Sequence, residues 1–201
     1  GRRVLALCQG NQPLSEGFTG PTEPVALILL DDTVRSDAPE ILRFFSDQGV
    51  DLKVISGDNT ATVSTVAERA GVPNADKSVD ARTLDDEEKL SQAIRESTVF
   101  GRVTPHQKRS MVASLQSEGH VVAMTGDGVN DVLALKDADM GIAMGSGSSA
   151  SRGVAQLVLL DNSFSTLPEV LAQGRKVINN IERVANLFVT KAAYALLLTA
   201  I

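Results

Sequence analysis

The sequence predicts an α/β fold in which helices cover a mostly parallel, doubly wound sheet. Short apolar runs alternate with helical patterns along most of the 201 residues, and this alternation favours parallel strands joined by helical crossovers. Each apolar run ends in a polar turn, and glycines follow several of the helical patterns, where a left-handed stop is favoured. The expected architecture is Rossmann-like, with its ligand site outside the carboxyl ends of the strands.

The order of these elements follows from hydrophobic spacing. Apolar runs predict strands at 25–30, 51–55, 99–100, 121–125, 140–144 and 156–160, and we expect the first of them to be buried. Apolar residues at helical spacing predict helices at 36–48, 60–70, 83–96, 104–118, 129–136 and 168–183. Thr104 and Pro105 suit the cap and the first position of a helix. Gly49, Gly71 and Gly119 stand where helices are expected to stop.

Composition excludes several classes of function. The chain has 19 Lys and Arg against 25 Asp and Glu, a net charge of −6, and no basic cluster. Such a chain is poorly suited to a nucleic-acid backbone. Aromatic residues make up 3% of the chain and Trp is absent, so base-stacking platforms are not expected either. The single cysteine, Cys8, excludes an internal disulfide and a cysteine-based metal site.

The C-terminal segment differs from the rest of the chain. Residues 187–201 are almost wholly apolar and are interrupted by Lys191. This run is shorter than the roughly 20 residues that span a bilayer. We expect it to be a truncated transmembrane helix that follows a mixed polar helix, with a buried terminal helix as the alternative.

The string TGDGVND at 125–131 is the strongest chemical signal. It follows an apolar strand directly and opens a helix, so that Asp127, Asn130 and Asp131 converge at the carboxyl edge of the sheet. The glycines allow the backbone to approach a ligand closely. Carboxylate oxygens in this setting suit Mg²⁺, which is bound by a few carboxylates together with phosphate and water.

Two further signals accompany this string. Ser56 and Gly57 follow another apolar strand, where a hydroxyl and an N–H at a helix start can bind phosphoryl oxygens. Lys108 lies in the first turns of the helix that begins at Thr104. Hydroxyl, lysine and paired aspartates are the parts of a phosphoryl-transfer site, which requires positioning and charge neutralisation.

In this combination the chain resembles the haloacid dehalogenase superfamily, and within it the P-type cation-transporting ATPases. The strings that match the later motifs of that family are SGDN at 56–59, TPHQK at 104–108 and TGDGVND at 125–131. Weaker matches are DTVR at 32–35, FGRV at 100–103, ALKDADMGIAMG at 134–145, VLLDN at 158–162, GR at 174–175 and NNI at 179–181. The resemblance covers nearly the whole chain and implies a haloacid dehalogenase-like core.

The resemblance implies a reaction in which an aspartate takes the γ-phosphate of ATP, with Mg²⁺ as the metal cofactor. It implies that Asp127 ligates Mg²⁺ and that Asp131 orders the site. Asn130 would hydrogen-bond the phosphoryl group or the aspartate that carries it, and Lys108 would neutralise phosphoryl charge. The remaining implied residues are Ser56 and Gly57 for phosphoryl oxygens, and Asp32, Arg35, Asp58 and Arg102 near the nucleotide or the hinge.

This sequence departs from the family pattern in two respects. Val132 and Leu133 replace the common Ala-Pro pair, a variant associated with a bacterial subgroup that includes calcium transporters. The Asp-Lys-Thr-Gly-Thr motif with the phosphorylated aspartate is missing, as are the nucleotide-binding and actuator domains and most membrane helices. The expected partner is therefore the N-terminal half of the same pump.

The expected segments and setting follow from the same resemblance. Residues 1–31 would end the nucleotide-binding domain and include the strand that returns to the core. Residues 32–165 would form the phosphorylation core, 166–186 the stalk and 187–201 the truncated transmembrane helix. The setting would be the plasma membrane of a bacterium, entered through the C-terminal helix, with the core on the cytoplasmic side. Two alternatives stay open at this point: a soluble phosphatase of the same superfamily, and a non-catalytic module that binds a nucleotide or another subunit.

Overall fold

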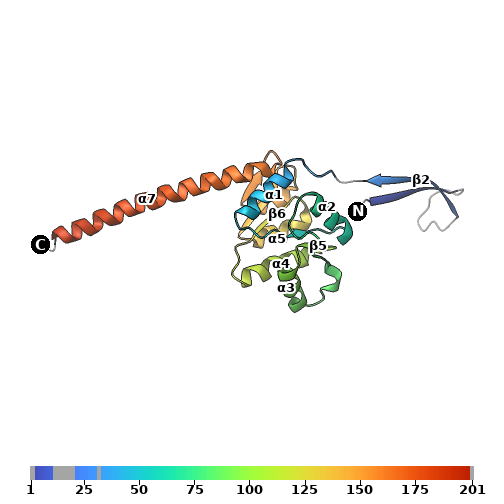
Figure 1. Ribbon diagram of the computed structural model, residues 1–201, viewed down its shortest axis with the longest axis horizontal. Coiled ribbons are helices and arrows are strands. Elements are labelled where there is room, and N and C mark those ends of the chain that lie inside the picture. Colours follow the sequence, from blue (N-terminus) through green and yellow to red (C-terminus); the bar gives the residue numbers. More distant parts are fainter. Residues whose placement is uncertain (1–2, 11–20, 31–32, 200–201) are drawn as a thin grey trace. The chain divides into compact units, whose positions relative to one another are not determined.

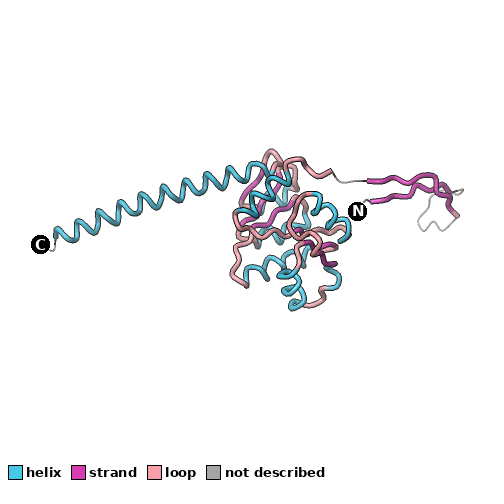
Figure 2. Tube along the Cα trace, in the orientation of Figure 1, coloured by secondary structure: helices cyan, strands magenta, loops and turns pink. Residues whose placement is uncertain are grey.

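A computed structural model describes residues 3–10, 21–30 and 33–199. The chain divides into two compact units, Gly1–Asn162 and Ser163–Ile201. The first holds a β-hairpin and an α/β core, and the second is dominated by one long helix (Figures 1 and 2). Asp32, which the resemblance assigns to the nucleotide or hinge region, lies outside the described residues.

The first sheet of the core is parallel and has the order β3-β5-β4. Its strands are β3 (Val54–Ile55), β5 (Val99–Gly101) and β4 (Ser78–Asp80). Val99 and Phe100 are fully buried, and they point to opposite faces of the sheet because side chains alternate along a strand. Helices must therefore cover both faces, as a doubly wound fold requires.

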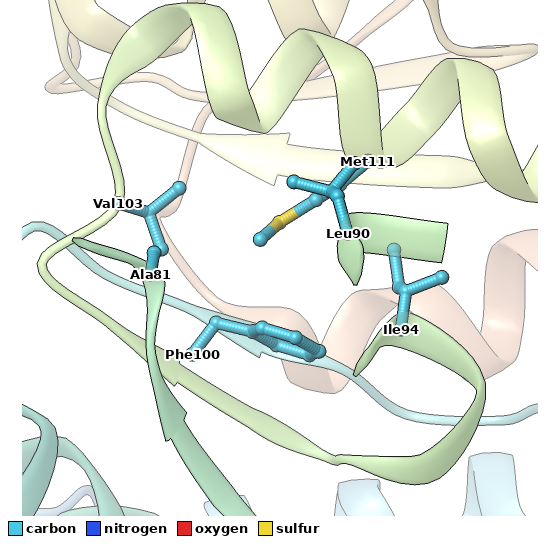
Figure 3. Close-up of a cluster of buried hydrophobic side chains, with 6 residues drawn as sticks. All are labelled: Ala81, Leu90, Ile94, Phe100, Val103 and Met111. Carbon is cyan, nitrogen blue, oxygen red and sulfur yellow. The ribbon is translucent and has the colours of Figure 1, made fainter. Parts of the chain in front are cut away.

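The two faces of β5 are covered by different helices. Val99 packs with Val63 and Ala67 of α2 (Thr60–Arg69). On the other face, Phe100 packs against α3 (Glu87–Glu96) and α4 (Pro105–Ser117), which contribute Leu90, Ile94 and Met111. Figure 3 shows these side chains pointing toward one another beneath α4, with Ala81 and Val103 completing the cluster.

The second sheet is also parallel and has the order β6-β7-β8. Its strands are β6 (Ala123–Gly126), β7 (Met140–Met144) and β8 (Leu157–Leu159). The short helix α5 (Val132–Asp137) connects β6 to β7, and the short helix α6 (Ser149–Val154) connects β7 to β8. Met124 of β6 and Leu135 of α5 pack with Val112 of α4. Since Met111 of α4 belongs to the other cluster, α4 connects the two sheets.

Helix ends agree with the sequence. Helix α1 (Ala38–Asp47) is followed by Gly49, and Gly71 and Gly119 follow α2 and α4. All three glycines have positive φ, at 77°, 82° and 86°, the conformation that a helix stop favours in glycine. The prediction of these stops is confirmed.

The N-terminal hairpin corrects one expectation. β1 (Arg3–Gly10) and β2 (Thr22–Leu30) pair antiparallel, and every residue of β2 is exposed. The expectation of a buried strand at 25–30 was therefore wrong in its burial, although a strand is present. β4 and α6 were not predicted, because their sequences show neither a long apolar run nor a helical period.

The second unit contains α7 (Leu167–Thr199), a continuous helix of 33 residues. It covers the ranges expected for the stalk and for most of the apolar terminal run. Among the helices of the described residues, none combines the length and the apolar character needed to cross a membrane.

Candidate active site

The turn after β6 is built around Asp131. The chain leaves β6 at Gly126 and enters a 3-10 turn, Val129–Asp131, that leads directly into α5. Asp131 folds back so closely that a Cβ on Gly126 would lie 2.6 Å from the Asp131 Cβ. Since real Cβ atoms do not approach this closely, only glycine fits at position 126. The first glycine of the string thus serves the packing of the turn.

Asp131 forms a buried ion pair with Lys108. The Lys108 Nζ donates to the Asp131 Oδ1 at 2.6 Å, and both side chains are 11% exposed. The other carboxylate oxygen, Oδ2, accepts from the Gly128 N–H at 3.2 Å. Both oxygens are thus engaged within the protein, so Asp131 holds the lysine and the turn in place and leaves ligand binding to other groups.

Asp127 has the opposite environment within the same turn. Its residue is exposed, and among the described residues its carboxylate has no hydrogen-bond or ion-pair partner. Asn130 is exposed too. A free carboxylate is the kind of ligand that Mg²⁺ takes together with phosphate and water. The described residues contain no cluster of three or more metal-ligating side chains, so further ligands would have to come from phosphate, water or another part of the protein.

Ser56 occupies the corresponding turn of the first sheet. Its Oγ accepts from the Asp58 N–H at 3.1 Å, so the hydroxyl proton stays available to an anion. Gly57 is exposed beside it. Asn59 caps α2 by accepting from the Ala61 N–H at 3.0 Å. The turn therefore places the Ser56 hydroxyl and the exposed Gly57 just before a helix start, a position that suits anion binding.

Helix α4 links the two turns. The Val103 N–H donates to the Ser56 carbonyl at 3.0 Å, and the next residue, Thr104, caps α4 with a complete capping box. One turn further along the helix, Lys108 reaches Asp131. The hydrogen bonds of the described residues thus run from the Ser56 turn through α4 to the Asp131 turn.

The residues assigned to the nucleotide or hinge lie in two places. The Arg102 N–H donates to the Asp58 carbonyl at 2.7 Å, and its Nε lies 3.7 Å from the Asp80 Oδ2. Hydrogen bonds from Arg82 lower the pKa of Asp80 to about 2, so Asp80 is ionised beside Arg102 at neutral pH. Arg35 instead donates to the Asn162 carbonyl at 2.9 Å, apart from the Arg102 and Asp58 group.

Sequence reasoning missed the residues behind the Asp127 turn. Between the expected strands at 140–144 and 156–160, the sequence predicts a glycine and serine loop at 145–149. In the structure Ser148 caps α6, which begins at Ser149, and Ser151 lies inside that helix. Ser151 is fully buried, and its Oγ donates to the Gly128 carbonyl at 2.7 Å. A run of small residues directly after β7 was the available signal, and it did not indicate which turn the run would contact.

A match to a family model provides the class of this protein. The model of haloacid dehalogenase-like hydrolases matches residues 4–139, and the chain belongs to that family. The expected α/β fold and haloacid dehalogenase-like core are thereby confirmed.

Several curated proteins are similar along nearly the whole chain. The calcium-transporting ATPase CtpE of Mycolicibacterium smegmatis is 55% identical over 98% of this chain, which covers 25% of that protein. The probable cation-transporting ATPase exp7 of Streptococcus pneumoniae is 44% identical, and the human calcium-transporting ATPase type 2C member 1 is 35% identical, each over 100% of the chain. The chain spans about a quarter of the length of these relatives. The predicted resemblance to P-type ATPases, including bacterial calcium transporters, is confirmed.

Solved structures agree. The catalytic domain of the CPx-ATPase CopB-B has a TM-score of 0.55 and 25% identity, with 74% of this chain and 49% of that chain covered. A zinc-transporting PIB-type ATPase has a TM-score of 0.63 at 24% identity, with 91% of this chain and 29% of that chain covered. The second likeness supports the fold. Because the sequence matches above extend through α7, the soluble-phosphatase alternative loses its support.

Proposed function

We propose that this chain is the C-terminal part of the phosphorylation domain of an ATP-driven, P-type cation pump. The observation that carries the proposal is the buried Lys108–Asp131 pair, whose aspartate lies in the same turn as the exposed Asp127. The similarity to calcium- and cation-transporting ATPases supports the same class of protein. The chain supplies the Mg²⁺- and phosphate-binding motifs, and another segment supplies the nucleophilic aspartate.

In this proposal each group of the site has a separate role. Asp127 would hold Mg²⁺. The positive charge of the metal ion would offset the negative charge of the phosphoryl group and of the aspartate that receives it. Lys108 presents its ammonium group to the phosphoryl oxygens, because Asp131 fixes it from behind. Ser56 and Gly57 donate to other phosphoryl oxygens, and Asn130 donates from the rim of the turn. Such positioning and charge neutralisation are the main demands of phosphoryl transfer.

Open strand edges support the proposal that a missing strand carries the nucleophile. Among the described strands, β3 pairs with β5 alone and β6 pairs with β7 alone. Ala123 and Thr125 of β6 are exposed. We propose that a parallel strand from the rest of the pump pairs with these edges and ends beside Asp127. Its last residues would then lie at the same rim as Lys108 and Ser56.

The remaining assignments concern the nucleotide and the membrane. Arg102 and Asp58 are joined by a backbone hydrogen bond, and we assign them, with Arg35 and Asp32, to the ATP or hinge side of the site. We assign α7 to the stalk and membrane entry, and the core to the cytoplasmic side of a bacterial plasma membrane. Calcium is the proposed cargo, since the names of the CtpE relatives specify it.

The test uses the intact pump and ATP labelled at its γ-phosphate. Asp127→Asn removes the charge that holds Mg²⁺, so we expect it to abolish phosphoenzyme formation in membranes supplied with Mg²⁺. Asp76→Asn is the matched control, because Asp76 is an exposed aspartate in the loop before β4, and it should label normally. Normal labelling of the Asp127→Asn pump would overturn the assignment.

A further inference from the structure

The backbone of the Asp127 turn is held by the segment between β7 and α6. The Ser148 N–H donates to the Asp127 carbonyl at 2.8 Å. The Ser151 Oγ lies 2.7 Å from the Gly128 carbonyl and 3.3 Å from the Asp127 carbonyl. Both carbonyls of the turn thus have hydrogen-bond partners in the segment between β7 and α6.

The position of the Ser151 hydroxyl is closely determined. Its residue is fully buried, so water does not compete for the hydroxyl. The Ser148 and Ser151 Oγ atoms are 2.6 Å apart. Because Ser151 has one hydroxyl proton and directs it to the carbonyls, Ser148 is the donor in this pair. The result is a chain of hydrogen bonds from the cap of α6 to the Asp127 turn.

The loop before α6 is itself held by hydrogen bonds. The Arg152 Nη1 donates to the carbonyls of Gly145 at 2.6 Å and Gly147 at 3.0 Å. A Cβ on Gly147 would lie 2.9 Å from the Asp127 carbonyl oxygen and 3.1 Å from the Asp127 Cα. The backbone of this loop therefore packs directly against the residue that carries the exposed carboxylate.

We propose that Ser151 is a positioning residue for the metal-binding carboxylate of Asp127, a role that rests on the proposed function. Ser151 touches neither metal nor phosphate. Its hydroxyl donates to the carbonyl of the Gly128–Val129 peptide at 2.7 Å and lies 3.3 Å from the carbonyl of the Asp127–Gly128 peptide. It thereby holds the backbone from which the Asp127 side chain projects. Residues that orient a metal ligand in this way change metal affinity when they are removed.

The test measures metal binding rather than turnover. Mn²⁺ serves as a paramagnetic substitute for Mg²⁺, and free Mn²⁺ is counted by electron paramagnetic resonance in the intact, purified pump with beryllium fluoride as phosphate mimic. The Mn²⁺ binding that disappears in the Asp127→Asn pump is assigned to this site. The Mn²⁺ that the Asp127→Asn pump still binds is held elsewhere and is subtracted from the total. For Ser151→Ala we expect the half-saturating Mn²⁺ concentration at this site to rise about tenfold, the lower end for residues that support metal ligands.

Ser114→Ala is the matched control. Ser114 is also a buried helical serine, and its Oγ donates to the Ser91 Oγ at 2.9 Å, away from the Asp127 turn. The control should leave the half-saturating concentration unchanged, even where it lowers the unfolding temperature as much as Ser151→Ala does.

The remaining outcomes overturn the proposal in distinguishable ways. If Ser151→Ala changes only the unfolding temperature, Ser151 is structural and the proposed function stands. If both serine variants weaken Mn²⁺ binding equally, the effect is a general loosening of the core and the positioning role is wrong. If Asp127→Asn removes no Mn²⁺, the metal assignment fails and the role of Ser151 fails with it.

Discussion

Asp127 and Asp131 show how one sequence motif contains residues with different tasks. Asp127 and Asp131 are four positions apart in the same string, yet one is exposed and the other is 11% exposed and paired with Lys108. The burial of Asp131 makes it dependent on its partner, because a buried charge without a counter-charge is strongly unfavourable. The exposed Asp127 has no such dependence and is free to bind a ligand.

We predict that Lys108→Met destabilises the core by about 3 kcal/mol, since it leaves the Asp131 carboxylate buried without its cation. Methionine keeps the apolar stem of the side chain, so the loss in free energy of unfolding comes from removal of the positive charge. Urea unfolding followed by circular dichroism measures the effect. Lys89→Met is the control: Lys89 pairs with Asp85 at 2.6 Å on the surface, and such exposed pairs contribute little to stability. Equal losses in the two variants would contradict the buried-pair argument.

At the scale of elements, α4 carries most of the organisation of the site. Its N-terminus is defined by the Thr104 capping box, in which Thr104 accepts from the Gln107 N–H and Gln107 accepts from the Thr104 N–H. Gln107 also donates to the Ala81 carbonyl at 2.7 Å, which ties the helix start to the first sheet. Its buried face holds Lys108, Met111 and Val112, so one helix sets both the core and the position of the ammonium group.

We predict that Thr104→Ala lowers the free energy of unfolding by about 1 kcal/mol, the usual cost of losing an N-cap side chain. Thr104→Ser keeps the capping oxygen and should retain most of the stability. Urea unfolding of the three proteins side by side measures the difference. If the serine variant is as unstable as the alanine variant, the capping oxygen is not the source of the stability.

At the scale of the whole molecule, the described segments differ in how much they depend on one another. Both strands of the hairpin expose their side chains, including Leu27, which is 65% exposed, and an isolated two-stranded ribbon is marginal in water. Most apolar side chains of α7 are exposed as well, among them Leu196 at 72%, although Leu167 at the start of the helix is buried. The buried clusters lie instead between α2 and α5 along the chain. The core therefore holds its own hydrophobic interior.

We predict that residues 33–162 unfold at the same temperature as residues 1–162, because removal of the hairpin uncovers no buried cluster. Thermal unfolding followed by circular dichroism compares the two. A piece of residues 49–162 is the control, since it lacks α1 and its buried Ile41, and it should unfold at a lower temperature. A lower unfolding temperature for residues 33–162 would show that the hairpin contributes to the core.

Much of the fold could be predicted because its signals are local. The cap at Thr104 and the glycine stops need only a few neighbouring residues to be recognised, and the strand at 140–144 agrees with β7 at both ends. The exposure of β2 could not be predicted. An apolar run favours burial, but it does not show which other part of the protein would cover it. β4 has three residues and exists through its pairing with β5, a contact between distant positions.

The sequence by itself determined the α/β class, the position of the polar turns and the identity of the residues at them, because each depends on spacing within one element. Only the tertiary structure decided that Lys108 meets Asp131 across 23 positions, and that Ser151 supports the Asp127 turn from a helix 24 positions away. Local spacing cannot specify these pairings, since they depend on how the helices pack on the two sheets.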